Sequence, residues 1–404
     1  MQPPARNLLA NERISPDRFA QIPLFSYGFR PFFLGAAIWA LVAIAIFLGW
    51  LANVLQPAPN YGALAWHGHE MLFGYASGVV AGFLLTAVPN WTGRLPVVGW
   101  RLASLFALWC AGRLVFLMIG TLGALPAILI DSAFLPILIV VISREIVVGR
   151  NWNNLKPLVL VALLAAANVA YHAEVLAAGV PNLGLRAGVA GLVALIVLIG
   201  GRITPSFTHS WLLRSGSSSL PASFGLIDKL ALLASGLALL AWIAFPGTQA
   251  TALLSLLAAT ALAARLSRWQ GPRTWREPLL FVLHLGYGFV ALGFLLGAIN
   301  ILIPGSLGTA ALHAWTVGAI GLMTLGVMTR AARGHTGHTL AASPVTTAIY
   351  GAATAAALLR VAAGILPEYY MPLIAAAGVA WGAAFTLFLI EYAPMLLRPR
   401  QQTV

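Results

Sequence analysis

Residues 66–70, Trp66-His67-Gly68-His69-Glu70, open an apolar run that continues to Val88. The run is long enough to cross a membrane, since a hydrocarbon core about 30 Å thick needs a helix of about 20 apolar residues. Two imidazoles and a carboxylate at the mouth of such a segment cost free energy to desolvate. They therefore need a partner, which can be a metal ion, a haem or one another. The stretch predicts a membrane protein with a buried metal centre.

The composition extends the membrane prediction to the whole chain. Of the 404 residues, 60% are hydrophobic and 8% are charged, too few charges to cover a water-soluble globule of this size. Twelve apolar runs of membrane length are joined by short connections, so we expect one all-α polytopic bundle. The runs are 32–52, 66–88, 101–121, 124–143, 155–178, 183–200, 226–245, 250–268, 278–301, 307–331, 344–366 and 370–392.

The positive charges set the expected orientation of the bundle. Twenty of the 23 Lys and Arg residues fall in the terminal segments or beside connections on one side. The positive-inside rule makes that side cytoplasmic, so segments 1–31 and 393–404 are expected in the cytoplasm, flanking a membrane bundle at 32–392. The net charge of +13 is therefore assigned to an anionic lipid surface and not to nucleic acid.

A single cysteine, Cys110, lies in the third predicted span. One cysteine excludes a disulfide framework, an iron–sulfur cluster and covalent haem attachment through Cys-x-x-Cys-His. A haem in this protein would be held non-covalently through histidine.

Most of the ionisable residues inside the spans fall at one depth. A helix rises about 1.5 Å per residue, so the expected orientation places nine such side chains in the outer halves of their spans. These are His67, His69, Glu70, Arg113, Asp131, His172, Glu174, His313 and Arg360. A single membrane histidine is more often a packed, hydrogen-bonded side chain, but nine ionisable groups at one level favour a functional site.

His284, in the ninth predicted span, lies deeper in the membrane. Measured from the turn between the ninth and tenth spans, it stands about 30 Å down its helix, whereas His313 stands about 14 Å down its own. The two cannot easily share one metal ion. His284 is either part of a second, inner site with His335 or His338, or a core histidine bonded to a neighbouring helix. His209 is expected in a solvated inner loop.

The spacing of His67 and His69 allows two arrangements. If the second span is already helical there, the rings point about 200° apart and serve different neighbours; if it is extended, both can bind one ion. A repeat of small residues favours the helical arrangement, because it forms a smooth stripe that admits a neighbouring helix or a flat macrocycle. The stripe consists of Glu70, Gly74, Gly78 and Gly82.

The second and tenth predicted spans form a weak internal repeat. An ungapped alignment of His69 with His313 also pairs Gly74 with Gly318, Gly82 with Gly326, and residues 91–94 (WTGR) with residues 335–338 (HTGH). The offset of eight spans fits three arcs of four helices, with the sixth span as a poor third copy. This arrangement resembles the catalytic subunits of haem-copper oxidases and nitric oxide reductases, an architectural analogy that does not fix function.

Several blocks of the sequence resemble the NnrS family of bacterial inner-membrane proteins. The blocks are 27–33 (YGFRPFF), 67–71 (HGHEM), 81–93 (AGFLLTAVPNWTG), 200–202 (GGR), 284–287 (HLGY) and 313–337. The resemblance implies a protein of the bacterial inner membrane that contains haem and copper and acts in nitric oxide metabolism and resistance to nitrosative stress. It places five histidines in characteristic motifs, namely His67, His69, His284, His313 and His335.

The leading hypothesis is an oxidoreductase similar to nitric oxide reductases, which binds nitric oxide at a centre of haem b, copper or both. Imidazole binds both metals, and a small uncharged gas can reach a buried site through lipid. The expected metal ligands are His67, His69 and His313, with His172 and His284 as further candidates. An unidentified donor, a quinol or a small redox protein, would supply electrons.

The acidic and basic residues of the spans have supporting roles in this hypothesis. Glu70, Asp131 and Glu174 would relay protons or orient ligands, while Arg113 or Arg360 would pair with haem propionates. His335 would assist in cofactor binding. Two alternatives remain open: a transporter that binds an ion or haem transiently, with Gly-Pro interruptions as hinges, and a metal- or haem-handling assembly factor for another respiratory complex.

Overall fold

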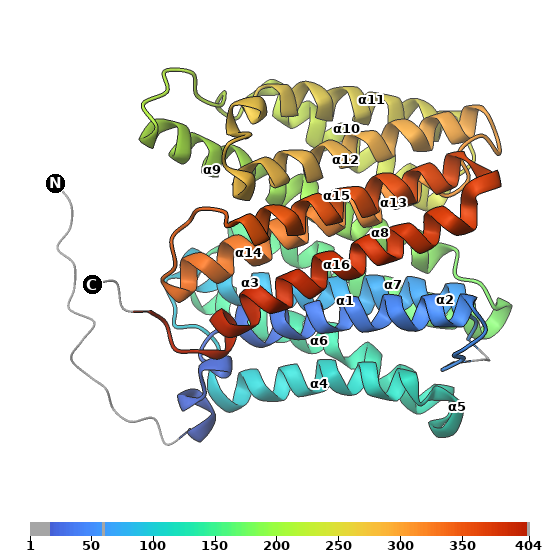
Figure 1. The fold of residues 1–404 in the computed structure, drawn as a ribbon, viewed down its shortest axis with the longest axis horizontal. Helices are drawn as coiled ribbons and strands as arrows, with labels where there is room; N and C mark the ends of the chain where they lie inside the picture. Colours follow the sequence, from blue (N-terminus) through green and yellow to red (C-terminus); the bar gives the residue numbers. More distant parts are fainter. Residues whose placement is uncertain (1–16, 59–60, 402–404) are drawn as a thin grey trace.

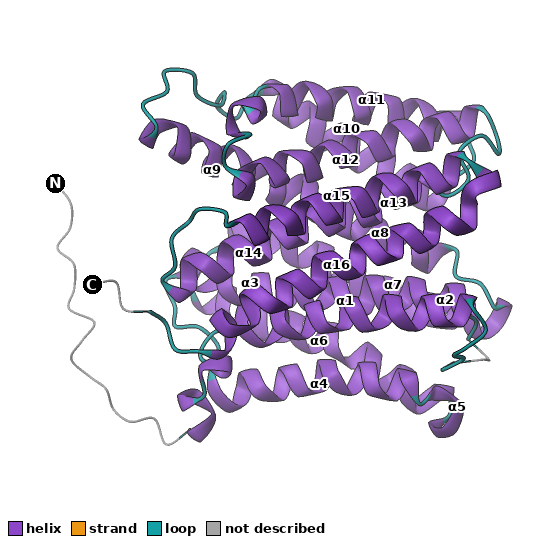
Figure 2. Ribbon diagram, in the orientation of Figure 1, coloured by secondary structure: helices purple, strands orange, loops and turns teal. Residues whose placement is uncertain are grey.

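The computed structural model describes residues 17–58 and 61–401. Within these residues every regular element is helical (Figure 2), and twelve helical segments are long and apolar enough to cross a membrane. The predicted all-α, multi-pass architecture is therefore confirmed. Residues 1–16 and 402–404 of the predicted terminal segments lie outside the described residues.

Nine of the twelve spans are single α-helices that follow the predicted order (Figure 1). They are α1 (Phe29–Leu51), α4 (Gly99–Leu117), α6 (Ala124–Val148), α7 (Leu155–Ala178), α10 (Leu226–Ala244), α11 (Gln249–Ser267), α12 (Pro278–Leu302), α15 (Pro344–Ile365) and α16 (Tyr370–Leu397). Large apolar side chains such as Leu114, Val140 and Val379 are exposed on these helices, as expected where helices face lipid.

The second, sixth and tenth spans each contain a π-helix between two α-helical parts. The second span consists of α2 (Ala63–His69), η3 (Glu70–Ala76) and α3 (Ser77–Thr92). The sixth consists of α8 (Leu183–Leu195), η5 (Ile196–Gly200) and α9 (Gly201–Arg214). The tenth consists of α13 (Ala310–His313), η7 (Ala314–Gly321) and α14 (Leu322–Thr336). Such π-helical segments are rare and are frequently found at functional sites.

These three spans meet in the bundle and will be called the central spans. Helix α8 packs on both η3 and η7, and α3 packs on α14. The central spans end at Thr92, Arg214 and Thr336, 122 residues apart in each case. The π-helices η3 and η7 also fall in the register in which His69 aligns with His313. The sixth span is thus a fuller third copy of the repeat than its sequence indicated.

The two ends of the bundle are defined by the first and last helices. Helix α1 begins and α16 ends at the same end (Figure 1), where the Arg30 guanidinium donates to the carbonyl oxygens of Leu396 and Arg398 at 2.9 and 2.6 Å. A cation at a helix C-terminus offsets the partial negative charge of the free carbonyls. This end is called the near end, and the other the far end.

The sixth span continues beyond the predicted end at Gly200. Pro205 lacks the N–H that would bond to the Gly201 carbonyl, one helical turn back. Arg265 of α11 supplies the missing donor, with its Nη2 atom 3.0 Å from that carbonyl. The helix therefore runs on to Arg214. The prediction of a loop at His209 was wrong, because His209 lies on α9, where it is exposed.

The glycine stripe of the second span is filled by side chains of α1 and α4. A Cβ added at Gly78 would lie 3.1 Å from the Trp109 ring, and one added at Gly82 would lie 2.7 Å from the Phe33 ring. Of the two explanations left open for the stripe, the structure therefore favours close helix packing over a macrocycle.

Candidate metal centre

Five ionisable side chains from four spans meet in the far half of the bundle, and they are called the far cluster. They are His69 of α2, Glu70 of η3, Arg113 of α4, Asp131 of α6 and His172 of α7. None is more than 4% exposed. Buried charges persist only when they are paired and hydrogen-bonded, so the contacts within the cluster decide what it can do.

Asp131 is the hub of the far cluster. Its Oδ2 atom lies 3.2 Å from Nε2 of His69 and 3.0 Å from Nε2 of His172. The Asn168 amide donates to the same oxygen at 2.9 Å, while its own oxygen lies 3.0 Å from Nε2 of His69. Three helices that are distant in sequence thus present their polar atoms to one point.

Arg113 and Glu70 complete the charge balance. Arg113 pairs with Oδ1 of Asp131 through Nη2, and its Nε lies 3.3 Å from Oε2 of Glu70. The other Glu70 oxygen lies 2.8 Å from Nδ1 of His69. Two carboxylates therefore face one guanidinium, and one more positive charge makes the cluster neutral. A proton on His69 or a monovalent metal ion can carry that charge.

The arrangement can hold a metal ion. Ligand atoms of His69, Asp131 and His172 lie within 4.8 Å of one another. Among the described residues, this is the only group of three or more His, Cys, Asp or Glu side chains close enough to hold one metal ion. Two imidazoles and one carboxylate suit copper, zinc or non-haem iron. Tyr61 lies with its hydroxyl 3.0 Å from Nδ1 of His172, the kind of outer contact that orients a metal-binding imidazole.

Aromatic rings leave the far cluster no room for a porphyrin. The His69 ring stacks on Phe116 with centroids 4.5 Å apart, and its centroid lies 4.5 Å from that of His172. Tyr171 packs edge-on against His69 at 5.7 Å. The cluster therefore fits a single ion and does not fit a haem.

His67 belongs to a different group, because α2 is helical at both histidines. Its ring stacks on Phe47 of α1 at 4.0 Å, and its Nδ1 atom is buried without a hydrogen bond among the described residues. His313 and Arg360 lie within electrostatic range of it. Nδ1 of His313 donates to the Thr309 carbonyl at 2.9 Å, which leaves Nε2 available as a ligand.

The His67–His313–Arg360 group has the donor set that a haem needs. Two imidazoles from different spans offer nitrogen atoms, and Arg360 keeps a buried Nη1 atom unpaired among the described residues. A guanidinium of this kind pairs well with a propionate. Arg113, the other candidate for that role, is engaged by Asp131 and Glu70.

Glu174 lies apart from both groups, although it was expected at the same depth. Its carboxylate accepts from the backbone N–H groups of Asn182, Leu183 and Gly184 at 2.8 to 2.9 Å. It thus caps the N-terminus of α8, where an anion is stabilising. The structure gives this residue an anchoring contact in place of a position near His69 or Asp131.

The inner histidines do not form a second metal group among the described residues. Nε2 of His284 lies 2.9 Å from the Thr208 hydroxyl of α9, which is the expected bond to a neighbouring helix. His335 packs against the rings of Tyr27 and Phe29. His338 bonds to Thr336 at 2.8 Å. Two explanations were left open for His284. Its contacts fit a core histidine bonded to a neighbouring helix and not a second metal site.

Three buried polar contacts involve residues that the sequence analysis did not identify. Asn168 precedes His172 by one helical turn, so helical periodicity could have placed it on the same face. Tyr61 lies in the connection between α1 and α2, where helical periodicity in the sequence makes no prediction. Asp228 of α10 pairs with the buried Arg265 of α11 at 2.9 Å. No sequence pattern around either residue predicts this contact between helices.

The comparison with known families agrees with this architecture. The NnrS protein family matches residues 23–400, which is nearly the whole chain. No curated protein shows significant similarity to the chain. The match covers all twelve spans and both histidine groups.

Proposed function

The chain belongs to the NnrS protein family, and from this premise we propose that it binds nitric oxide at the far cluster and reduces it. The observation that carries the proposal is the convergence of His69, Asp131 and His172, whose ligand atoms lie within 4.8 Å of one another. The site lies inside a bundle of membrane-length helices, and an uncharged gas can reach it from lipid without a polar channel.

Copper is the ion proposed for the far cluster. Monovalent copper together with Arg113 balances the two carboxylates of Glu70 and Asp131, whereas a divalent ion leaves one net positive charge. When bound, the metal would supply the redox chemistry and a coordination position for the gas. A haem b is proposed at His67 and His313, with Arg360 paired to a propionate.

The residues around the metal would hold ligands and move protons. Reduction of nitric oxide consumes protons as well as electrons. Glu70 accepts from Nδ1 of His69 at 2.8 Å, so its carboxylate can orient that ring and hold a proton beside it. Asp131 and Asn168 fix the other side of the ring. A quinol or small redox protein is proposed as the electron donor.

The proposed setting is the bacterial inner membrane, with the near end of the bundle in the cytoplasm. The charge distribution supports this orientation, and an even number of spans puts both chain ends on one side. The far cluster then lies in the outer half of the membrane. Reporter fusions to both ends and to the connection between α1 and α2 test the orientation.

The test of the proposed function is metal content together with a nitrosyl signal. Purified protein is expected to contain haem and copper, to give a ferrous nitrosyl spectrum and to consume nitric oxide with an electron donor. Asp131→Asn is expected to lose copper, while Asp228→Asn, which breaks a buried ion pair elsewhere, is expected to keep it. Protein that contains haem but shows neither nitrosyl formation nor consumption contradicts the proposal.

A second candidate is a metal-handling protein without turnover of its own. One observation favours it: all four ring nitrogens of His69 and His172 have hydrogen-bond partners, so both imidazoles are satisfied without an ion. A site of this kind can exchange its metal. Rapid loss of copper to a chelator, with transfer to a partner complex and no nitric oxide consumption, would support this candidate.

A further inference from the structure

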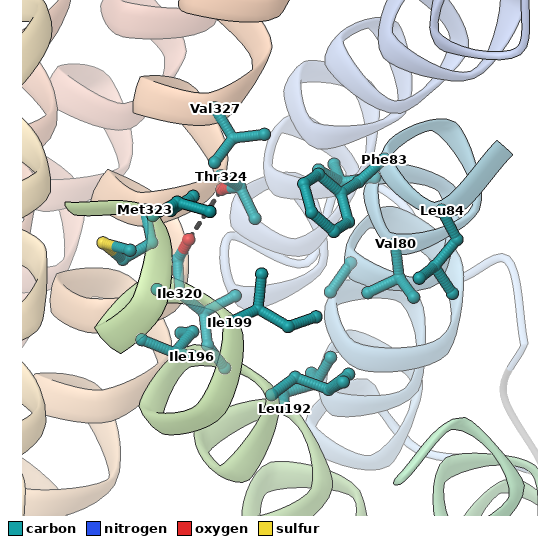
Figure 3. Close-up of a pocket in the computed structure, with 15 residues that line it drawn as sticks. Val80, Phe83, Leu84, Leu192, Ile196, Ile199, Ile320, Met323, Thr324 and Val327 are labelled. Atoms are coloured by element: carbon teal, nitrogen blue, oxygen red, sulfur yellow. Dashed lines mark hydrogen bonds between the residues drawn. The ribbon is translucent and has the colours of Figure 1, made fainter. Parts of the chain in front are cut away.

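A cavity of about 90 Å³ lies where the three central spans meet. Figure 3 shows side chains from all three spans around it: Val80 and Phe83 of α3, Ile199 of η5, and Thr324 and Val327 of α14. The cavity is separate from the far cluster and contains none of the residues assigned to metal binding.

The lining of the cavity has almost no polar side chains to which water could hydrogen-bond. Of its fifteen residues, Thr324 alone carries a hydroxyl. That hydroxyl donates to the Ile320 carbonyl at 2.6 Å (Figure 3) and lies 2.6 Å from the hydroxyl of Tyr75. Its one proton is therefore used, and the Tyr75 hydroxyl can donate to it. Apolar cavities without free polar groups stay dry and take up apolar guests such as xenon.

The cavity follows from the π-helices of the central spans. Ala76 ends η3, Ile196, Ile199 and Gly200 belong to η5, and Ile320 belongs to η7. Regular α-helices pack by fitting ridges of side chains into grooves. A π-helix widens its span and shifts the register of the following residues, so the three surfaces do not interdigitate at the junction.

The cavity can be entered from the hydrocarbon region. Val80, Phe83 and Ile199 are only half-buried, so the lining reaches the outside of the bundle. These residues lie near the middle of their spans, away from either end. Ala76, which lines the cavity, ends η3, the π-helix that begins at Glu70 of the far cluster. The cavity therefore lies one π-helix away from the far cluster along the second span.

We propose that this cavity is a binding site for a small, uncharged gas molecule drawn from the bilayer. Its volume, apolar lining and position all suit a guest of a few heavy atoms. That the gas is nitric oxide rests on the proposed function, whereas the binding site itself does not.

Xenon is the probe that tests the site. We expect crystals of the full-length, metal-free protein pressurised with xenon to show a xenon peak between Val80, Ile199 and Val327. Val327→Phe fills the space, so xenon occupancy should fall about tenfold or more in a close-packed interior. Val80→Phe provides a second filling variant if the first fails to fold.

Val317→Phe is the matched control. Val317 is also a half-buried valine of the tenth span, but it does not line the cavity. Its variant should therefore bind xenon like the wild type. A wild type without xenon at this place, xenon that persists in both filling variants, or an acyl chain occupying the cavity would overturn the proposal. Because no metal is present, these outcomes are independent of nitric oxide consumption.

Discussion

His67 and His69 stand two positions apart on α2 and serve different neighbours. The ring of His67 stacks on Phe47 at 4.0 Å, whereas Nε2 of His69 lies 3.2 Å from Oδ2 of Asp131. The helical backbone turns about 200° between them, so one short motif contributes to two separate groups. This relationship divides the expected single level of polar residues into a far cluster and the His67–His313–Arg360 group.

The first prediction is that the two histidines control different spectroscopic signals. His69→Ala removes a ligand of the far cluster and should lose the copper signal while keeping haem. His67→Ala should lose or alter the haem and keep copper. Metal content per chain measures both effects, and electron paramagnetic resonance of the oxidised protein, in which the copper is divalent, separates the copper and haem signals. Loss of the same signal from both variants would contradict two separate centres.

The second prediction concerns the hub of the far cluster. Asp131→Asn leaves Arg113 facing one carboxylate in place of two, and breaking a buried ion pair costs about 3–5 kcal/mol. We expect a lower unfolding midpoint in detergent and loss of copper. Asp228→Asn, beside Arg265, should lower the midpoint comparably without loss of copper. Equal copper retention in the two variants would argue against Asp131 as a ligand.

The third prediction uses the glycine stripe to test how tightly the cluster is held. A Cβ at Gly74 would lie 2.5 Å from Nη1 of Arg113, 2.8 Å from Nε1 of Trp39 and 2.9 Å from Oε2 of Glu70. Gly74→Ala should displace these groups, at an overpacking cost of about 1–3 kcal/mol, and should weaken copper binding. Gly82→Ala, which meets only aromatic carbons and Phe32 Cβ, is the control with unchanged copper.

The fourth prediction separates Glu174 from the redox chemistry. Glu174→Gln weakens the cap of α8, so stability should fall by about 1 kcal/mol. Copper content and nitric oxide consumption should stay at the wild-type level. Unfolding in detergent and consumption assays measure the two properties. A strong loss of consumption at unchanged stability would return Glu174 to a proton-transfer role.

The fifth prediction concerns the path of the sixth span through Pro205. Arg265→Met removes the donor to the Gly201 carbonyl and should destabilise α9, visible as faster proteolysis in this helix. Pro205→Ala in the same chain restores a backbone N–H at that position and should recover about 1 kcal/mol. We expect the stability to recover only in part, because Asp228 has lost its ion pair with Arg265 in both variants. No difference between the single and double variants would refute the role given to Arg265.

Sequence alone was enough to predict the twelve spans and the all-α class. The thickness of the hydrocarbon core sets the length of each apolar run, and this is a local property of the chain. The position of each polar residue along its helix follows from the same count. The second and tenth spans end at left-handed glycines, Gly93 and Gly337, which lie in the aligned segments 91–94 (WTGR) and 335–338 (HTGH).

Tertiary contacts decided which of these residues meet. Side chains at one depth can face any direction around the bundle, so depth could not tell that Asp131 joins His69 to His172 or that Glu174 turns away to cap α8. The continuation of the sixth span depends on Arg265, sixty residues beyond Pro205, and no local pattern contains it. The sequence by itself determined the number of helices long and apolar enough to cross a membrane and where along each helix its polar groups stand. Only the packing of distant helices decided the partners, because hydrogen bonds and ion pairs act over a few ångströms while sequence neighbours spread along a span of about 30 Å.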